Sequence, residues 1–87
     1  MEHELKTWPD FFQQVWNRRK PFEYRLNDRN FKKGDILKLK EYIPQLKEFT
    51  GREMRVFVVD IWKKIPGMPE DYCIMSIASI LPPKEQP

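Results

Sequence analysis

The chain has 87 residues, of which 40% are hydrophobic, 14% aromatic and 33% charged. This length and composition predict one small folded domain, and they exclude both a disordered chain and a second core. The net charge is only +3, yet residues 18–40 carry nine cations against three carboxylates, a local excess that either binds phosphate groups or is simply solvated.

The first predicted elements are a strand and a short helix. Residues 3–8 are expected to form the strand, and the helix is expected to run from Pro9 to about Arg18, with the proline fixing its entry. Four apolar side chains of the helix fall at helical spacing and predict a stripe that faces the core: Phe11, Phe12, Val15 and Trp16.

The segment 22–25 alternates aromatic and charged residues, which predicts a short strand with two distinct faces. If Phe22 and Tyr24 face the core, Glu23 and Arg25 lie side by side on the opposite face, and Lys20 comes just before them. Such a polar cluster could hold a ligand that has both donors and acceptors. The alternative is an edge strand whose two charges are merely solvated.

Turns and strands alternate through the rest of the chain. Phe31 is expected to anchor the turn-rich segment 26–30 in the core, and Gly34 suits the positive φ of a tight turn. Strands are predicted over 36–42, 52–61 and 72–80, with a hairpin connection at 43–51 that Thr50 and Gly51 close, and a loop at 62–71. Alternation places Leu37 and Leu39 inward and gives Met54, Val56 and Val58 one shared face. Beyond Val58 the continuous apolar run predicts a β-bulge or burial on both sides.

Five strands and one early helix predict a mainly β, α+β fold. The short connections favour a small, largely antiparallel barrel that buries its edges, with the N-terminal helix packed beside it. We expect a single domain over residues 1–81 and an irregular, proline-rich C-terminal tail over residues 82–87. Because only one helix is predicted, a helix-turn-helix protein is disfavoured.

Several kinds of chemistry are excluded by the residues that the chain lacks. Cys73 is the only cysteine, so we expect a buried thiol in a reducing compartment and no internal disulfide. His3 is the only histidine and is expected at a frayed terminus, which argues against a zinc site or a serine triad. The three glycines are too scattered for a phosphate loop. Without a signal peptide or an apolar run of roughly 18 residues, we expect a cytoplasmic protein with no membrane, metal or cofactor partner.

Some of these residues form motifs that are similar to those of a known family. The motifs are His3-Glu4-Leu5-Lys6-Thr7-Trp8-Pro9, Lys20-x-x-Glu23-x-Arg25, Asn27-Asp28-Arg29-x-Phe31-x-x-Gly34-Asp35, Thr50-Gly51-Arg52-Glu53 and Tyr72-x-Ile74-Met75-Ser76-Ile77. From His3 to about Leu81 the chain resembles the bacterial and phage-borne domains of unknown function related to the ASCH family, in the PUA-like superfamily. The resemblance implies a PUA-like β-barrel, with a cleft between the barrel and the early helix, and RNA binding.

The resemblance also implies which side chains line the cleft. ASCH-type domains carry G-x-K-x-x-E-x-R there; Lys20, Glu23 and Arg25 match this motif, and Arg18 stands at the glycine position. The Arg25 fork can donate to phosphate or a base edge, Lys20 can act as a point charge, and Glu23 can orient both cations or accept from an exocyclic amine. Trp8 is a neighbour that we expect to pack against the helix rather than to stack on a base. Further ligand-binding residues are expected at Lys6, Arg18, Arg19, Arg29 and Lys32.

Three functions remain open from the sequence. The first is a module that binds RNA or a nucleotide-like ligand, RNA rather than DNA, through the cleft and the basic segment 18–40. The second is a small amidohydrolase of modified nucleosides, as in some relatives of the family, where Lys20 would activate the nucleophile and Glu23 would carry the proton. Pro21 and Glu23 stand where those enzymes have a hydroxyl residue and a threonine, so no catalytic residue is assigned outright. The third is a phage or host module for protein–protein contact.

Overall fold

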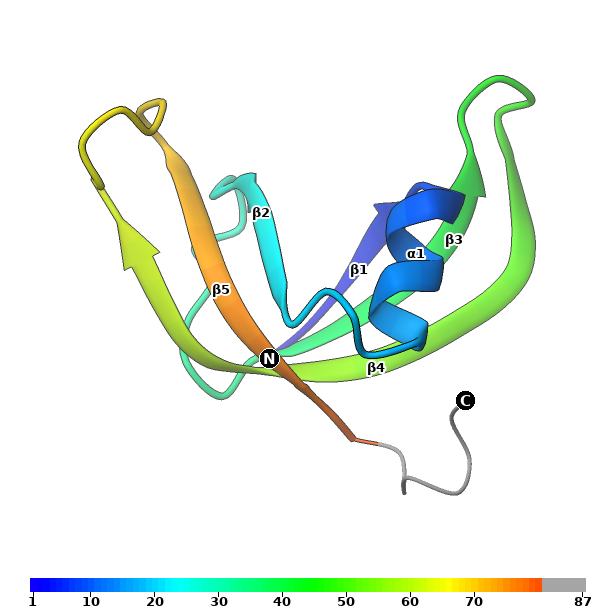
Figure 1. Ribbon diagram of the computed structural model, residues 1–87, viewed down its shortest axis with the longest axis horizontal. Coiled ribbons are helices and arrows are strands. Elements are labelled where there is room, and N and C mark those ends of the chain that lie inside the picture. The colour runs from blue at the N-terminus through cyan, green and yellow to red at the C-terminus, as the bar shows by residue number, and fades with distance from the viewer. Residues whose placement is uncertain (81–87) are drawn as a thin grey trace.

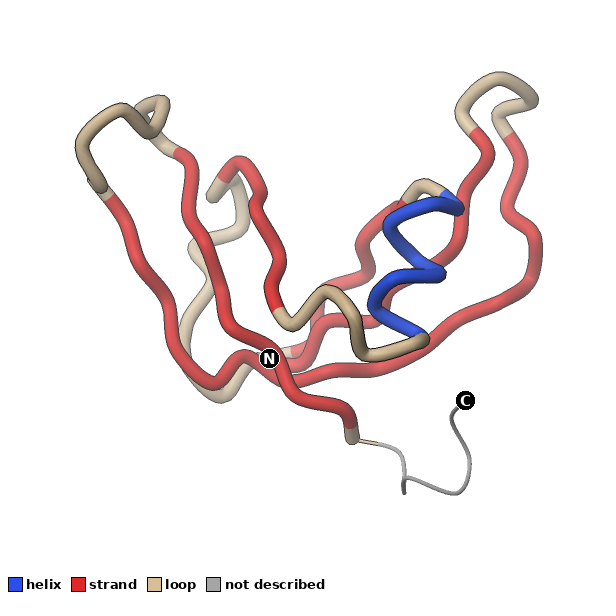
Figure 2. The backbone as a smooth tube through the Cα atoms, viewed as in Figure 1, coloured by secondary structure: helices blue, strands red, loops and turns tan. Residues whose placement is uncertain are grey.

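The computed structural model describes residues 1–80. This part of the chain forms a five-stranded sheet that curls into a half-barrel, and α1 lies inside its curve (Figure 1). The tube in Figure 2 shows a loop at each of the two raised ends of the sheet and further loops nearer its base. No helix within the described residues is long and apolar enough to cross a bilayer. The predicted tail at 82–87 lies outside the described residues.

The elements follow the predicted order. They are β1 (Glu2–Thr7), α1 (Pro9–Trp16), β2 (Phe22–Leu26), β3 (Ile36–Ile43), β4 (Glu48–Lys63) and β5 (Tyr72–Ser79). The mainly β fold with one N-terminal helix is therefore confirmed.

The strand order across the sheet is β1-β3-β4-β5-β2, so β1 and β2 are its two end strands. Neighbouring strands pair antiparallel except β1 and β3, which run parallel. Among the described strands, β1 and β2 do not pair with each other. The expectation that the barrel buries its edges is wrong at this point, because the sheet closes only halfway and leaves these two edges facing an open side.

The strand β4 is longer than predicted. It runs over Glu48–Lys63, whereas the sequence predicts a strand at 52–61, and the hairpin turn shrinks to residues 44–47. Gly51 lies inside β4 with φ +96°, a conformation that glycine adopts without Cβ strain. The register between β3 and β4 shifts between Lys40 and Tyr42, so residues 50–52 bulge out of the ladder while β4 pairs with β3 on both sides of them.

The core lies between the inner face of the sheet and α1. The largest fully buried side chains are Phe12, Phe31, Leu37, Leu39, Met75, Val56, Val58 and Cys73. They confirm the inward faces predicted for β3 and β4 and the anchoring of Phe31. In α1 the apolar stripe is narrower than predicted, because Phe11 is 46% exposed while Phe12 and Val15 are buried.

The β-bulge predicted after Val58 is confirmed. The register between β4 and β5 shifts between Val58 and Asp60. Val59 is exposed whereas Val58 is fully buried, so burial on both faces does not occur here. One extra residue on β4 therefore turns the following side chains and increases the local twist of the sheet.

The alternation of β2 is confirmed, but its two faces are the reverse of those expected. Glu23 is only 2% exposed and faces inward, whereas Phe22 and Tyr24 are exposed. The reason lies in the register, because Glu23 pairs with the buried Met75 of β5 and side chains opposite each other share a face. Alternation separates the two sets of side chains but does not say which set is inside.

His3 is held firmly in the structure, so the expected frayed terminus is wrong. Its side chain is buried, with Nε2 2.9 Å from Asp35 Oδ2 and the ring edge-on to Phe31. The backbone amide of Lys32 also donates to Asp35 Oδ2. Burial by itself raises the pKa of Asp35, but these hydrogen bonds outweigh it and hold the pKa below its ordinary value. Asp35 thereby fastens the turn before β3 to the start of β1.

Candidate nucleic-acid interface

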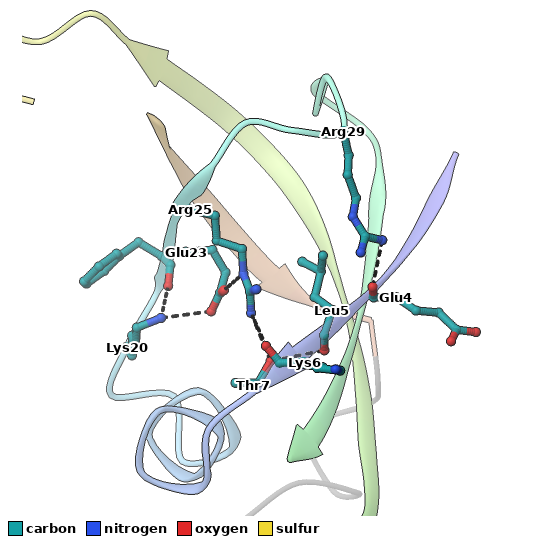
Figure 3. A network of polar contacts seen from close by, with 9 residues as sticks. Glu4, Leu5, Lys6, Thr7, Lys20, Glu23, Arg25 and Arg29 are labelled. Atoms are coloured by element: carbon teal, nitrogen blue, oxygen red, sulfur yellow. Dashed lines mark hydrogen bonds and ion pairs between the residues drawn. The ribbon is translucent and has the colours of Figure 1, made fainter. Parts of the chain in front are cut away.

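A buried carboxylate holds two cations at the open side of the half-barrel (Figure 3). Lys20 Nζ lies 2.8 Å from Glu23 Oε1, and Arg25 Nε lies 2.7 Å from Glu23 Oε2. Lys20 also donates to the carbonyl oxygen of Phe22 at 2.9 Å. Since a buried charge must be paired, Glu23 fixes the positions of both cations. The structure brings the three motif side chains together as expected, and their role in binding stays a prediction.

Two arginines reach from the β2 side to the edge of β1 (Figure 3). Arg25 Nη2 donates to the carbonyl oxygen of Lys6 at 3.0 Å and to Thr7 Oγ1 at 3.1 Å. Arg29 Nη1 donates to the carbonyl oxygen of Glu4 at 2.8 Å. Side chains therefore connect two strands whose backbones are not paired.

In each end strand, alternate residues point their backbone N–H and C=O groups toward the paired neighbour, and the residues between them point these groups toward the open side. The amide of Ile36 donates to the Met1 carbonyl, so the odd-numbered residues of β1 point toward β3 and the even-numbered ones point away. The amide of Ile77 donates to the Pro21 carbonyl, so the even-numbered residues of β2 also point away from their neighbour. Two rows of backbone donors and acceptors thus face the open side, and the arginines occupy part of one row.

A hollow of about 990 Å³ lies at this open side, between β1, the start of α1 and β2. Its lining joins the motif side chains to other charged and aromatic residues. The charged members are Glu4, Lys6, Lys20, Glu23, Arg25, Asp28, Arg29 and Lys40. Among the described residues, cations thus outnumber carboxylates around the hollow, which gives it a positive balance that suits an anionic ligand.

Aromatic side chains also line the hollow, and most of them are exposed. Trp8 is 55% exposed and stacks on Phe11 with ring centroids 6.3 Å apart. The expected packing of Trp8 against the helix is present, yet much of the indole remains open to the hollow. Lys20 Nζ lies 4.9 Å from the ring centre of Phe22, and Lys40 Nζ lies 4.8 Å from that of Phe49. Two cations of the hollow therefore lie over exposed aromatic rings.

The other predicted binding residues divide into two groups. Lys6 and Arg29 line the hollow. Arg18 instead lines a neighbouring pocket of about 380 Å³, while Arg19 and Lys32 are exposed side chains outside the lining of both. The basic segment 18–40 is thus only partly directed at the hollow, because its turns carry cations to several sides of the sheet.

Sequence reasoning missed Lys40, Phe49, Thr7 and Phe11 as lining residues. Lys40 reaches the hollow because the parallel pairing of β1 and β3 places it beside Lys6. The local sequence around Lys6 or Lys40 does not reveal which distant strand it pairs with. The outward alternation of Lys40 in its strand was the one available signal, and it is shared with many solvated lysines.

A second polar cluster holds α1 against the sheet. Arg52 donates to Glu41 through Nε at 3.0 Å and to Gln13 through Nη2 at 2.8 Å. Its guanidinium also lies 4.8 Å from the ring centre of Phe12. The hydrogen bonds from Arg52 and from the Thr50 hydroxyl hold the pKa of the buried Glu41 below its ordinary value. This cluster fixes the helix whose first turn forms one end of the hollow.

Other reactive groups are sparse in the part of the chain that the structure describes. Within residues 1–80 no three histidine, cysteine, aspartate or glutamate side chains gather to hold a metal ion. Cys73 is fully buried, and burial raises the pKa of its thiol, which disfavours the nucleophilic thiolate.

Two comparisons relate the chain to known proteins. A family model described as "Domain of unknown function (DUF3850)" matches residues 2–77. A protein of Escherichia phage P2 named "Uncharacterized 12.9 kDa protein in GpA 3'region" is 33% identical over 82 residues, which cover 92% of this chain and 72% of that protein. The family match includes every residue that lines the hollow.

Proposed function

The chain belongs to the DUF3850 family, and we propose that it binds RNA or a nucleotide-like ligand in the hollow between β1 and β2. The observation that carries the proposal is the buried Glu23 carboxylate, which holds Lys20 and Arg25 at the wall of a cationic hollow. A carboxylate in this position orients the two cations before any ligand arrives. Less side-chain freedom is then lost when the ligand binds.

The present partners of the arginines support an anionic ligand. Arg25 and Arg29 donate to neutral backbone carbonyls of Lys6 and Glu4 at the edge of β1. A phosphate oxygen is a charged acceptor and forms a stronger hydrogen bond with guanidinium than a carbonyl does. A phosphate that entered the hollow would therefore accept hydrogen bonds from Arg25 and Arg29 in place of the two carbonyl oxygens.

We also propose that the family is related to the ASCH family within the PUA-like superfamily. The Lys20-x-x-Glu23-x-Arg25 motif supports this relation, because its side chains meet in one hollow as the resemblance implies. Arg18, at the glycine position of the motif, lines the neighbouring pocket and leaves the larger hollow accessible. A cytoplasmic location is part of the proposal, since RNA and a reduced thiol such as Cys73 are both found there.

The proposal is tested by titrating a fluorescently labelled RNA at two salt concentrations. Affinity should fall steeply between 50 and 200 mM salt, and Arg29→Gln should weaken binding and reduce the salt slope by about 0.7 for the loss of one single-strand phosphate contact. Arg55→Gln is the matched control, because Arg55 is an exposed arginine paired with Glu2 outside the hollow. Absence of binding, or an affinity that does not change with salt concentration, would contradict the proposal.

Two further assays separate the other functions that the sequence leaves open. Turnover of an acylated cytidine that Glu23→Gln abolishes, with the fold retained, would replace binding by amidohydrolase chemistry. Protein partners that survive nuclease treatment of the lysate would instead indicate a protein-contact module. Either result, in the absence of salt-dependent RNA affinity, would contradict the proposed function.

A further inference from the structure

Resting on the proposed function, we infer that the hollow takes single-stranded RNA and stacks its unpaired bases on Trp8 and Phe11. Both side chains line the hollow and are about half exposed; Trp8 stands at the N-cap of α1 and Phe11 lies in its first turn. Exposed aromatic side chains that gather in one hollow, rather than singly on a surface, are typical of a binding site. Stacking on a base would cover this apolar surface, and every base has a face to offer.

The spacing of charge and aromatic surface fits a single strand. Lys20 Nζ lies close to two rings, 5.8 Å from the centre of Phe11 and 4.9 Å from that of Phe22. Lys40 Nζ lies 4.8 Å from the ring centre of Phe49, and both of these residues line the same hollow. A single strand presents phosphates and base faces alternately, so it can contact both kinds of group along one path.

The two strand edges give a second, independent reason to expect unpaired bases. The even-numbered residues of β1 and β2 point their backbone groups to the open side, and no described strand pairs with them there. Arginines occupy the carbonyl oxygens of Glu4 and Lys6, so the groups offered to a ligand are others, such as those of Tyr24. An unpaired base has free donors and acceptors on its Watson–Crick edge that such groups can satisfy. In a duplex these edges are already paired, and the base faces are hidden by their neighbours.

The test compares three polyanions of equal charge: a uridine-rich single-stranded RNA, an RNA duplex, and an abasic sugar-phosphate oligomer. The single strand should bind about tenfold or more tightly than the other two, as expected when at least one base stacks on an aromatic side chain. Trp8→Leu should remove most of this advantage and leave abasic binding unchanged. Trp8→Tyr, which keeps an aromatic face, should retain most of it.

Trp62→Leu is the matched control, because Trp62 is 46% exposed on β4 and does not line the hollow. If Trp8→Leu fails to fold by circular dichroism, Phe11→Leu makes the same test with a smaller change. Equal affinity for the single strand, the duplex and the abasic oligomer would overturn the inference while leaving the proposed function intact. Lack of salt-dependent binding to all three would instead overturn the proposed function.

Discussion

Arg25 in β2 donates to the backbone carbonyl oxygen of Lys6 in β1 at 3.0 Å, so a side chain joins the two end strands of the sheet. The same guanidinium is held by Glu23 on its Nε side. Arg25 therefore has two tasks in this geometry, since it completes the pairing of a buried carboxylate and it caps an open strand edge. A binding residue with a structural task of this kind needs controls that separate affinity from folding.

Arg25→Ala should destabilise the fold by about 2 kcal/mol, because it removes one of the two cations that pair with the buried Glu23 carboxylate. Urea denaturation should show a lower midpoint with an unchanged m-value. Arg55→Ala, which removes an exposed ion pair with Glu2, should leave the midpoint nearly unchanged. Equal midpoints for the Arg25 variant and the unmodified protein would show that Glu23 does not depend on this partner.

The β-bulge in β4 predicts opposite outcomes at two neighbouring valines. Val58→Ala should cost about 2 kcal/mol, because a fully buried side chain loses two methyl groups in a packed core. Val59→Ala should change the stability by less than about 0.5 kcal/mol, because its side chain is exposed. Thermal or urea unfolding of both variants checks the bulge, and similar losses at the two positions would place both valines in the core.

Much of this fold could be predicted because the spacing of apolar residues along a strand or helix indicates directly which side chains face the core. Leu37 and Leu39 face inward as predicted, since a two-residue period leaves only one apolar face in β3. Convergence of Glu23 with Arg25 follows from the same period, and Lys20 reaches back from the preceding turn.

The remaining features depend on pairings between distant segments. Aromatic residues in a strand favour an inward face, but the register of β2 with β5 turns Glu23 inward and leaves Phe22 exposed. The parallel pairing that brings Lys40 beside Lys6 is likewise invisible in either strand alone. Phe11 lies next to buried Phe12, and the side of α1 that packs on the sheet decides that Phe11 lines the hollow instead.

Acid should destabilise the protein through Glu41. The pKa of this carboxyl is lowered in the folded state by the hydrogen bond from Arg52, so its contribution to stability is present above the unfolded-state value of about 4.3 and is lost as the pH falls through the folded-state value. Melting temperatures between pH 7 and pH 3 should therefore drop at the acid end. In Arg52→Gln the drop should be smaller, and a drop of the same size in that variant would show that other carboxyls cause it.

The last prediction concerns the coupling of Lys20 to Glu23. In the unmodified protein Lys20→Met should destabilise the fold by about 1–2 kcal/mol, because Glu23 is buried and loses a charged hydrogen-bond donor. In a Glu23→Gln background the same change should be neutral or stabilising, since Lys20 and Arg25 are then two cations with no carboxylate between them. A double-mutant cycle by urea denaturation measures this coupling. Lys32→Met, at an exposed lysine outside the hollow, should show no coupling to Glu23→Gln, and equal effects of Lys20→Met in both backgrounds would mean that Glu23 does not hold this cation.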